Sequence, residues 1–193
     1  MAASTDEQTI FELKVALKYT KPPIWRRIQV PANCSFFDLH VAIQDLFQWS
    51  DEHLHKFEMV KPKRDVFAML MSGDFELDEY IGIPDRSMEH DFNIIPEKET
   101  KIRDQFALDE ANKNKCVYTY DFGSEWRHDI LLERIVPAVP NVLYPRCIAG
   151  RRQSPPEYPS DDWPYPNEPP FSPGDIKFRD PQVVWIDYPY KCF

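Results

Sequence analysis

Four of the five histidines fall in stretches whose patterning predicts ordered structure, and imidazoles are well suited to metal binding or proton transfer. His53 and His55 are two residues apart in an alternating run, so both side chains would lie on one side of a strand, with Cα atoms about 6.5 Å apart. Two ligands of one metal ion can use that spacing. His128 falls in another alternating apolar run, and His40 borders the apolar stripe of an expected helix.

These histidines allow two interpretations. His53, His55 and His128 could ligate one metal ion if the fold brought them together. Alternatively, each imidazole could be half-buried and satisfied by a backbone carbonyl or a carboxylate. Because no further ligand motif has a recognised spacing, we favour a hydrogen-bonded network and expect no metal or cofactor.

Charged residues should border this cluster. Arg26 shares strand parity with the apolar residues of its run, and an inward guanidinium requires a carboxylate or carbonyl partner. Asp121, Glu157 or Asp38 could supply it, and an alternative role is to bind a substrate anion. We expect Arg26, Asp121 and Glu157 to lie around one polar site where His40, the run containing His53 and His55, and His128 meet.

The sequence lacks a recognisable nucleophile. It has no Gly-x-Ser-x-Gly elbow and no His-Glu-x-x-His helix, and its five glycines are too widely spaced for a phosphate-binding or dinucleotide-binding loop. The triplet Asp121-Phe122-Gly123 has none of the other kinase motifs around it. These features favour a non-catalytic binding or adaptor protein. The alternative is a metal-assisted hydrolase or nuclease acting on nucleic acid.

The first elements that must position these residues are two strands and a helix. Alternation over Phe11–Tyr19 and an extended pattern over Trp25–Val30 predict neighbouring strands. Ser35, three residues before Asp38, predicts a helix N-terminus, and the apolar spacing predicts a helix over Phe36–Phe47.

The middle of the chain predicts three more strands around an acidic excursion. His53–Val60 alternates, and Cys116–Phe122 and Trp126–Ile135 flank a turn in which Gly123 would take the positive φ. Between them, Asp74–Glu99 contains nine acidic and two basic residues and is expected to be rich in loops with short helical turns.

The sequence as a whole predicts one α+β domain over 1–193, with a mixed sheet of roughly four to six strands and one main helix packed on it. Residues 1–10 are expected to be flexible. Over 137–193, 13 of 57 residues are proline but aromatics are frequent, so we expect an irregular ordered wrap with a short element near Val183–Asp187. The expected core comprises Leu13, Val15, Leu17, Ile28, Leu39, Ile43, Phe57, Ile130 and Leu132.

Composition limits partners and location. The net charge of -9 opposes general attraction to nucleic acid, so a protein partner is expected in preference, and Lys61, Lys63, Arg64, Arg151 and Arg152 are too few to predict a basic patch. No apolar run reaches the ~20 residues of a membrane helix, and the N-terminal residues resemble no leader, so we expect a cytoplasmic protein without membrane contact. The four cysteines are scattered, and no disulfide is expected.

Three blocks read together resemble the plasmid Orf3-like family, named after a root-inducing (Ri) plasmid, whose members are also labelled insertion-sequence passenger or TnpR-like proteins. The blocks are PPIWRRIQVP from Pro22, FDLHVAIQDLFQW from Phe37 leading to HLHKF from His53, and YTYDFGSEWRH from Tyr118. The resemblance covers most of residues 11–160, including Tyr144-Pro-Arg-Cys147, Gly150 and Pro155-Pro156-Glu157.

The resemblance implies a compact α+β fold and a mobile-element-associated origin, with no established biochemical activity. The sequence departs from the family pattern at three places. Ser124 replaces a usual acid, Ser154 replaces a usual cysteine, and the segment from Tyr158 to Asp162 replaces a Cys-Gly-Gly loop.

Overall fold

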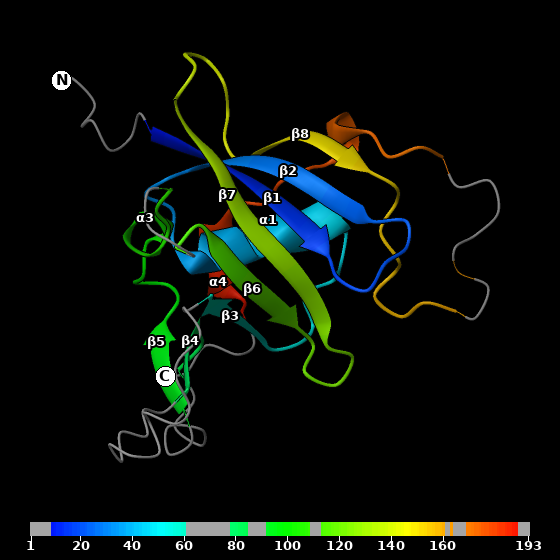
Figure 1. The fold of residues 1–193 in the computed structure, drawn as a ribbon, viewed down its shortest axis with the longest axis horizontal. Coiled ribbons are helices and arrows are strands. Elements are labelled where there is room, and N and C mark those ends of the chain that lie inside the picture. The colour runs from blue at the N-terminus through cyan, green and yellow to red at the C-terminus, as the bar shows by residue number, and fades with distance from the viewer. Residues whose placement is uncertain are drawn as a thin grey trace.

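Alternating residues build one large mixed sheet. The structure, a computed structural model, describes residues 9–60, 78–84, 92–108, 113–160, 163 and 169–188. Within these ranges eight strands lie in the order β5-β4-β3-β6-β7-β1-β2-β8 (Figure 1). The β4–β5 pair is parallel and all other neighbouring strands are antiparallel. The strands are β1 Thr9–Leu17, β2 Ile24–Pro31, β3 His55–Met59, β4 Asp78–Gly82, β5 Phe92–Pro96, β6 Lys115–Tyr120, β7 Trp126–Pro137 and β8 Arg146–Arg151.

One helix, α1 (Phe36–Phe47), packs along a single face of this sheet (Figure 1). It begins at the predicted residue because Ser35 and Asp38 form a capping box: the Asp38 N–H donates to Ser35 Oγ at 3.1 Å, and the Ser35 N–H donates to Asp38 Oδ2 at 2.8 Å. It ends at Gln48, which takes a left-handed conformation with φ 59°. Both predicted boundaries of this helix are confirmed.

The core lies between α1 and the sheet. All nine predicted core residues are buried, none with more than 4% of its surface exposed. The α+β class and the sheet carrying one main helix are confirmed, whereas the expected number of strands was too small. The reason is that β4 and β5 lie in the acidic excursion and β8 lies in the proline-rich segment, where charge and proline obscure the strand pattern.

The β6–β7 turn differs from its prediction. The residues with positive φ are Asp121 at 54° and Glu125 at 50°, not Gly123. Asp121 tolerates this conformation because its Oδ1 accepts a hydrogen bond from the Gly123 N–H at 2.9 Å, as in an Asx turn. The strand predicted from His53 begins instead at His55, so His53 lies in the preceding loop.

Within the segment predicted to wrap, Arg146–Arg151 instead form strand β8, and the described residues after β8 are the irregular part, which packs over the helix side of the sheet. It contains a 3-10 turn at Pro173–Asp175 and the short helix α4, Pro181–Ile186, close to the element expected there. The Phe171 ring lies 3.7 Å from the Arg26 guanidinium carbon, and Arg179 Nε donates to Asp45 Oδ1 of α1 at 2.6 Å. A third helix, α3, is a single turn at Ile102–Gln105.

Three of the four cysteines lie in the described part of the chain. Cys34, Cys116 and Cys147 are free, and Cys192 lies outside the described residues, as do residues 1–8. No described helix is both long and apolar enough to cross a bilayer.

Gly150 of β8 provides a test of how the wrap is attached. A Cβ at Gly150 would overlap the Phe171 ring, meeting Cδ1 at 2.7 Å, whereas a Cβ at Gly174 would meet only Ser172 Oγ at 3.7 Å. We expect Gly150→Ala to lower the free energy of unfolding by about 1–3 kcal/mol because Phe171 must leave Arg26. Gly174→Ala is the matched control, and urea denaturation measures both; an equal effect of the two substitutions would contradict this packing.

Candidate functional site

Two stacked imidazoles form the centre of the candidate site. His40 comes from α1 and His55 from β3, and their ring centroids are 3.5 Å apart with an interplanar angle of 3°. Both residues are buried. The helix periodicity of α1 turns His40 toward the sheet, and the parity of β3 places His55 on the side that also carries Phe57.

Each stacked imidazole has its own carboxylate. His40 Nε2 lies 2.7 Å from Asp51 Oδ1, and His55 Nε2 lies 2.6 Å from Glu97 Oε2. An ionised carboxylate only accepts hydrogen bonds, so each Nε2 carries the proton and donates it. The remaining nitrogen of each ring, Nδ1, is therefore an acceptor when the ring is neutral.

Two tyrosine hydroxyls complete the network. Gln44 Nε2 donates to the Tyr118 hydroxyl at 2.8 Å, which leaves the Tyr118 proton for His40 Nδ1, also at 2.8 Å. The Tyr188 hydroxyl lies 3.3 Å from His55 Nδ1, to which it can donate. Both rings thus have one donor and one acceptor satisfied in the same tautomer.

At the His40–Asp51 pair the electrostatics favour a neutral imidazole beside an ionised carboxylate. Burial lowers the pKa of His40 below its ordinary value, and the neighbouring His55 lowers it further. Burial acts to raise the pKa of Asp51, but His40 outweighs it and the pKa lies below its ordinary value. Asp51 also lies 3.9 Å from the Arg179 guanidinium, which adds to this effect.

His128 lies in the same interior but does not join the pair directly. Its ring centroid is 5.5 Å from that of Tyr118 and 4.5 Å from that of Phe47. Neither ring nitrogen forms a well-aligned hydrogen bond with a described residue, although backbone groups of Tyr118 and Trp126 lie near. Burial lowers the pKa of His128 to about 3, so this ring is neutral near pH 7.

A second, shallower cluster surrounds Glu157. The Glu157 carboxylate accepts from the Tyr120 hydroxyl and, through Oε2, from the Ser50 N–H at 2.8 Å and its hydroxyl at 2.5 Å. His53, about one third exposed, contacts the Tyr158 hydroxyl at 2.5 Å. His53 Nε2 is 4.0 Å from both Asp121 Oδ2 and Glu157 Oε1.

Arg26 lies elsewhere in the interior. Its guanidinium donates to the carbonyl oxygens of Trp25, Leu46 and Arg151 at 3.0–3.3 Å and to Ser154 Oγ at 2.8 Å. None of the three carboxylates suggested by the sequence is its partner, because main-chain carbonyls saturate it. Burial lowers the pKa of Arg26 to about 10.

The predicted site residues therefore divide into three groups. The structure pairs His40 with His55 and places His128 across Tyr118 from them; it brings His53 near Asp121 and Glu157; and it separates Arg26 from both groups. Sequence analysis missed the acceptors Asp51 and Glu97 and the tyrosine hydroxyls. Alternation in Cys116–Phe122 could have identified Tyr118 and Tyr120 as inward-facing, since they share the parity of buried Cys116.

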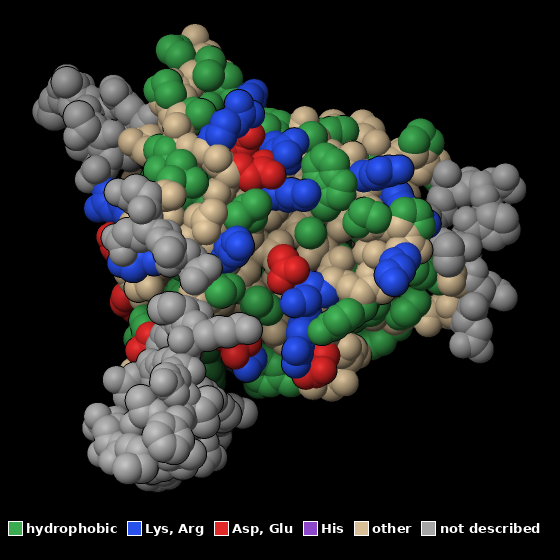
Figure 2. Space-filling model, in the orientation of Figure 1, with side chains coloured by type: hydrophobic (Ala, Val, Ile, Leu, Met, Phe, Trp, Pro, Cys, Tyr) green, Lys and Arg blue, Asp and Glu red, His purple; other side chains and the backbone are tan. Residues whose placement is uncertain are grey.

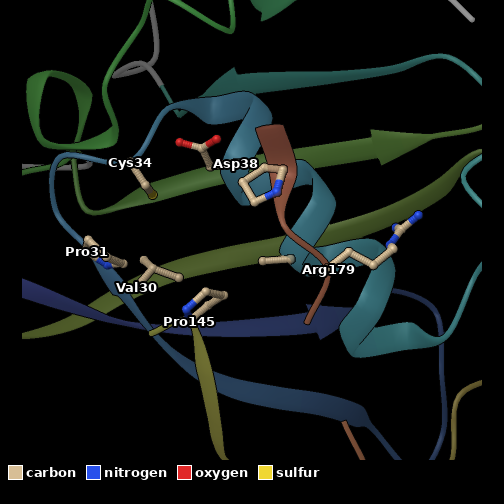
Figure 3. Close-up of a pocket in the computed structure, with 8 residues that line it drawn as sticks. Val30, Pro31, Cys34, Asp38, Pro145 and Arg179 are labelled. Carbon is tan, nitrogen blue, oxygen red and sulfur yellow. The ribbon is translucent and has the colours of Figure 1, made fainter. Parts of the chain in front are cut away.

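Two of the cavities lined by described residues bear on whether this protein has room for a ligand. One has a volume of about 30 Å³, about that of one water molecule, and is lined by Val30, Pro31, Cys34, Asp38, Ala42, Pro145, Arg179 and Pro181 (Figure 3). Figure 3 shows the Cys34 sulfur pointing into it and the Arg179 guanidinium turned away. Burial raises the pKa of the Cys34 thiol, so it is a poor nucleophile.

The other cavity, of about 220 Å³, opens beside Glu97 and between Pro84, Pro96 and Trp185. The Lys98 ammonium lies 3.8 Å from the centroid of the Trp185 ring and fills part of that aromatic face. Across the described ranges, no three His, Cys, Asp or Glu side chains are placed to hold a metal ion.

Comparisons with known proteins agree with this fold. The model of the family described as plasmid pRiA4b ORF-3-like protein matches residues 9–166. The uncharacterized protein y4hQ of Sinorhizobium fredii (strain NBRC 101917 / NGR234) is 28% identical over 157 residues, which are 81% of this chain and 70% of that protein. A crystal structure of MM3350 from Methanosarcina mazei Go1, a protein of unknown function, is 33% identical, covers 89% of this chain and 98% of its own, and has a TM-score of 0.70.

The Tyr118 hydroxyl allows a test of the network. Tyr118→Phe leaves His40 Nδ1 and Gln44 Nε2 without their partner in a buried site, so we expect the free energy of unfolding to fall by about 1–3 kcal/mol. Tyr19→Phe, at a side chain that is 81% exposed, is the control and should change little. Equal losses in the two variants, measured by urea denaturation, would contradict the network.

The lowered pKa of His128 predicts a pH dependence of stability. In the unfolded chain this imidazole binds a proton below about pH 6.5, whereas in the folded chain it does so only near pH 3. Its contribution is therefore present above pH 6.5 and is lost as the pH falls toward 3, by up to about 1.4 kcal/mol per pH unit. We expect His128→Leu to flatten the dependence of unfolding free energy on pH between 6.5 and 4.

Phe47→Leu is the control for this prediction. It alters a ring that packs on His128 but removes no titratable group, so it should lower stability by a similar amount at each pH. A His128→Leu variant that keeps the slope of the unmodified chain would show that His128 is protonated in the fold.

Proposed function

Because this chain belongs to the plasmid pRiA4b ORF-3-like family, in which the relatives above are of unknown function, we propose its function from its own geometry: a non-catalytic binding protein. The stacked histidines serve as the scaffold of that protein. The partner docks elsewhere, on the face of the sheet that α1 does not cover.

The observation that supports this proposal is the direction of the ring nitrogens of His40 and His55. Both Nε2 atoms point at carboxylates, and both Nδ1 atoms face tyrosine hydroxyls. A histidine acting as a general base needs a nitrogen within hydrogen-bond reach of the substrate. Here those positions are occupied by the protein itself.

The network also has a clear structural purpose. It joins α1, β3, β6 and the segment after α4 through hydrogen bonds in a low-dielectric interior, where each satisfied bond is strengthened and each broken one is costly. A rigid sheet with a fixed outer surface is what a binding protein requires, because pre-organisation reduces the entropy lost on association.

The competing function is a hydrolase or nuclease centred on His53. This imidazole is partly exposed and has two carboxylates, Asp121 and Glu157, at 4.0 Å, an arrangement that could serve acid–base chemistry. Against it, Glu157 already accepts from Ser50 and Tyr120, and the His53 Nε2 contacts Tyr158.

Chemical modification distinguishes a closed network from an open site. Diethyl pyrocarbonate acylates accessible neutral imidazoles, so we expect peptide mapping of the folded chain to show modification of His53 and protection of His40, His55 and His128. After unfolding in urea all four should react. Rapid modification of His40 or His55 in the folded chain would contradict the proposed function.

A cleavage assay tests the competing function directly. Labelled 20-nucleotide DNA and RNA, single-stranded and duplex, are incubated with the purified chain and Mg²⁺, Mn²⁺ or Zn²⁺. We expect no cleavage above the buffer control. Metal-dependent cleavage that is retained in a Lys177→Glu control but abolished by His53→Ala or Glu157→Gln would establish the hydrolase instead.

A further inference from the structure

We propose that the outer face of the sheet, opposite α1, binds single-stranded nucleic acid through its phosphates and bases. This inference rests on the proposed function, because it names the partner of the surface assigned there. The outer face is defined by the side chains of β3, β6, β7, β1, β2 and β8 that alternate with the core residues.

Strand register shows that this face is basic. Eight basic and four acidic residues point outward from these six strands, and Figure 2 shows Lys and Arg side chains spread across it. The basic residues are Lys14, Arg27, Lys56, Lys115, Arg127, Arg134, Arg146 and Arg151, and the acidic ones are Glu12, Glu58, Asp129 and Glu133. The face therefore has the opposite sign to the whole chain, whose net charge is -9.

Three of these cations form a row across the sheet. Lys115 and Lys14 both pair with Leu131 in register, one on each side of β7, and Lys14 pairs with Arg27. With neighbouring strands about 4.8 Å apart, the row from Lys115 to Arg27 spans about 14 Å. A row of this kind suits a phosphodiester backbone running across the strands.

Part of this positive charge has no ion-pair partner. Arg27 pairs with Glu133 and Arg134 with Glu12, both at 2.6 Å, and Lys56 and Arg127 pair with Glu58 and Glu125. Lys14, Lys115 and Arg151 form no ion pair within the described part of the chain, although Glu133 is near enough to Lys14 to interact with it electrostatically. Releasing the counterions around such cations is the main source of affinity for nucleic acid.

Two aromatic side chains lie among the cations. The Trp25 ring has Lys14 Nζ at 5.4 Å and the Arg27 guanidinium at 5.3 Å from its centroid. Tyr19, which is 81% exposed, has Lys18 Nζ at 5.9 Å and interacts with Arg127. An aromatic ring between cations provides a stacking surface for a base next to contacts for its phosphates.

The net charge of the chain does not prevent this. At physiological ionic strength the Debye length is about 8 Å, so a phosphate on the outer face is governed by the cations beside it and is screened from acidic groups elsewhere. The aromatic rings can stack on unpaired bases, which an acidic protein does not have. They also favour single strands over a duplex, because the bases of a duplex are already stacked on each other.

The experiment measures fluorescence anisotropy of labelled 20-mers of thymidylate and uridylate with the full chain in 50 mM salt, and then as a function of salt. We expect binding that weakens as salt rises. Lys14→Glu and Lys115→Glu should each weaken it several-fold and reduce the salt slope. Lys177→Glu, an exposed cation on the helix-side wrap, carries the same charge change and should retain most of the affinity.

Trp25 tests the stacking part of the proposal. We expect Trp25→Leu to weaken binding about ten-fold and Trp25→Phe to restore most of it, because the phenyl ring still stacks on a base. Thermal melting of both variants checks that they are folded. Equal affinities of Trp25→Leu and the unmodified chain would overturn the stacking assignment.

Three results would overturn the inference as a whole: no binding of either 20-mer in 50 mM salt, equal weakening by Lys177→Glu and Lys14→Glu, or a 20-base-pair duplex bound as tightly as the single strands. If a polyglutamate 20-mer binds in their place, the partner is an acidic protein. If the 20-mer is recovered uncleaved after any of these results, the proposed non-catalytic function still stands. If the 20-mer binds and is cleaved, the non-catalytic function is refuted but the docking surface is not.

Discussion

The face-to-face contact of His40 and His55 is the interaction on which the rest of the interior depends. Two imidazoles 3.5 Å apart cannot both carry a charge in a buried site without strong repulsion, so the arrangement requires at least one neutral ring. A neutral imidazole has one donor and one acceptor nitrogen. Each of the two rings has a carboxylate, of Asp51 or Glu97, at Nε2 and a tyrosine hydroxyl at Nδ1. The loop after α1, the end of β5 and the segment after α4 are thereby held at fixed positions around the stack.

The elements and site residues that could be predicted are those whose sequence patterns lie within a few neighbouring positions. The helix over Phe36–Phe47 was predicted to the residue because its cap and its apolar stripe are both encoded within a few positions. Strands β1, β2, β6 and β7 followed from alternation, which also placed His55 and His128 on the core side.

The missed features depend on long-range contacts. Glu97 reaches His55 only because β5 pairs in parallel with β4, and Tyr188 arrives from more than 130 residues beyond His55. Asp51 lies in a loop, where no periodicity indicates which way a side chain points. Arg26 was correctly placed inward, but its partners are carbonyl oxygens, which every residue supplies and no sequence pattern identifies.

The same alternation that buries the histidines also separates the charges of the chain. On β7, His128 and Ile130 face the core, while Arg127, Asp129 and Leu131 face outward beside Lys14 and Lys115. On the helix side the proline-rich wrap covers the sheet and closes over Arg26 through Ser154 and Phe171. Ser154 Oγ accepts a hydrogen bond from the Arg26 guanidinium at 2.8 Å, and a hydroxyl is a stronger acceptor than a thiol. The wrap covers only the helix side of the sheet, so the cations of β1, β2 and β7 that alternate with core residues stay on the outer face. A chain of negative net charge can therefore present a basic surface.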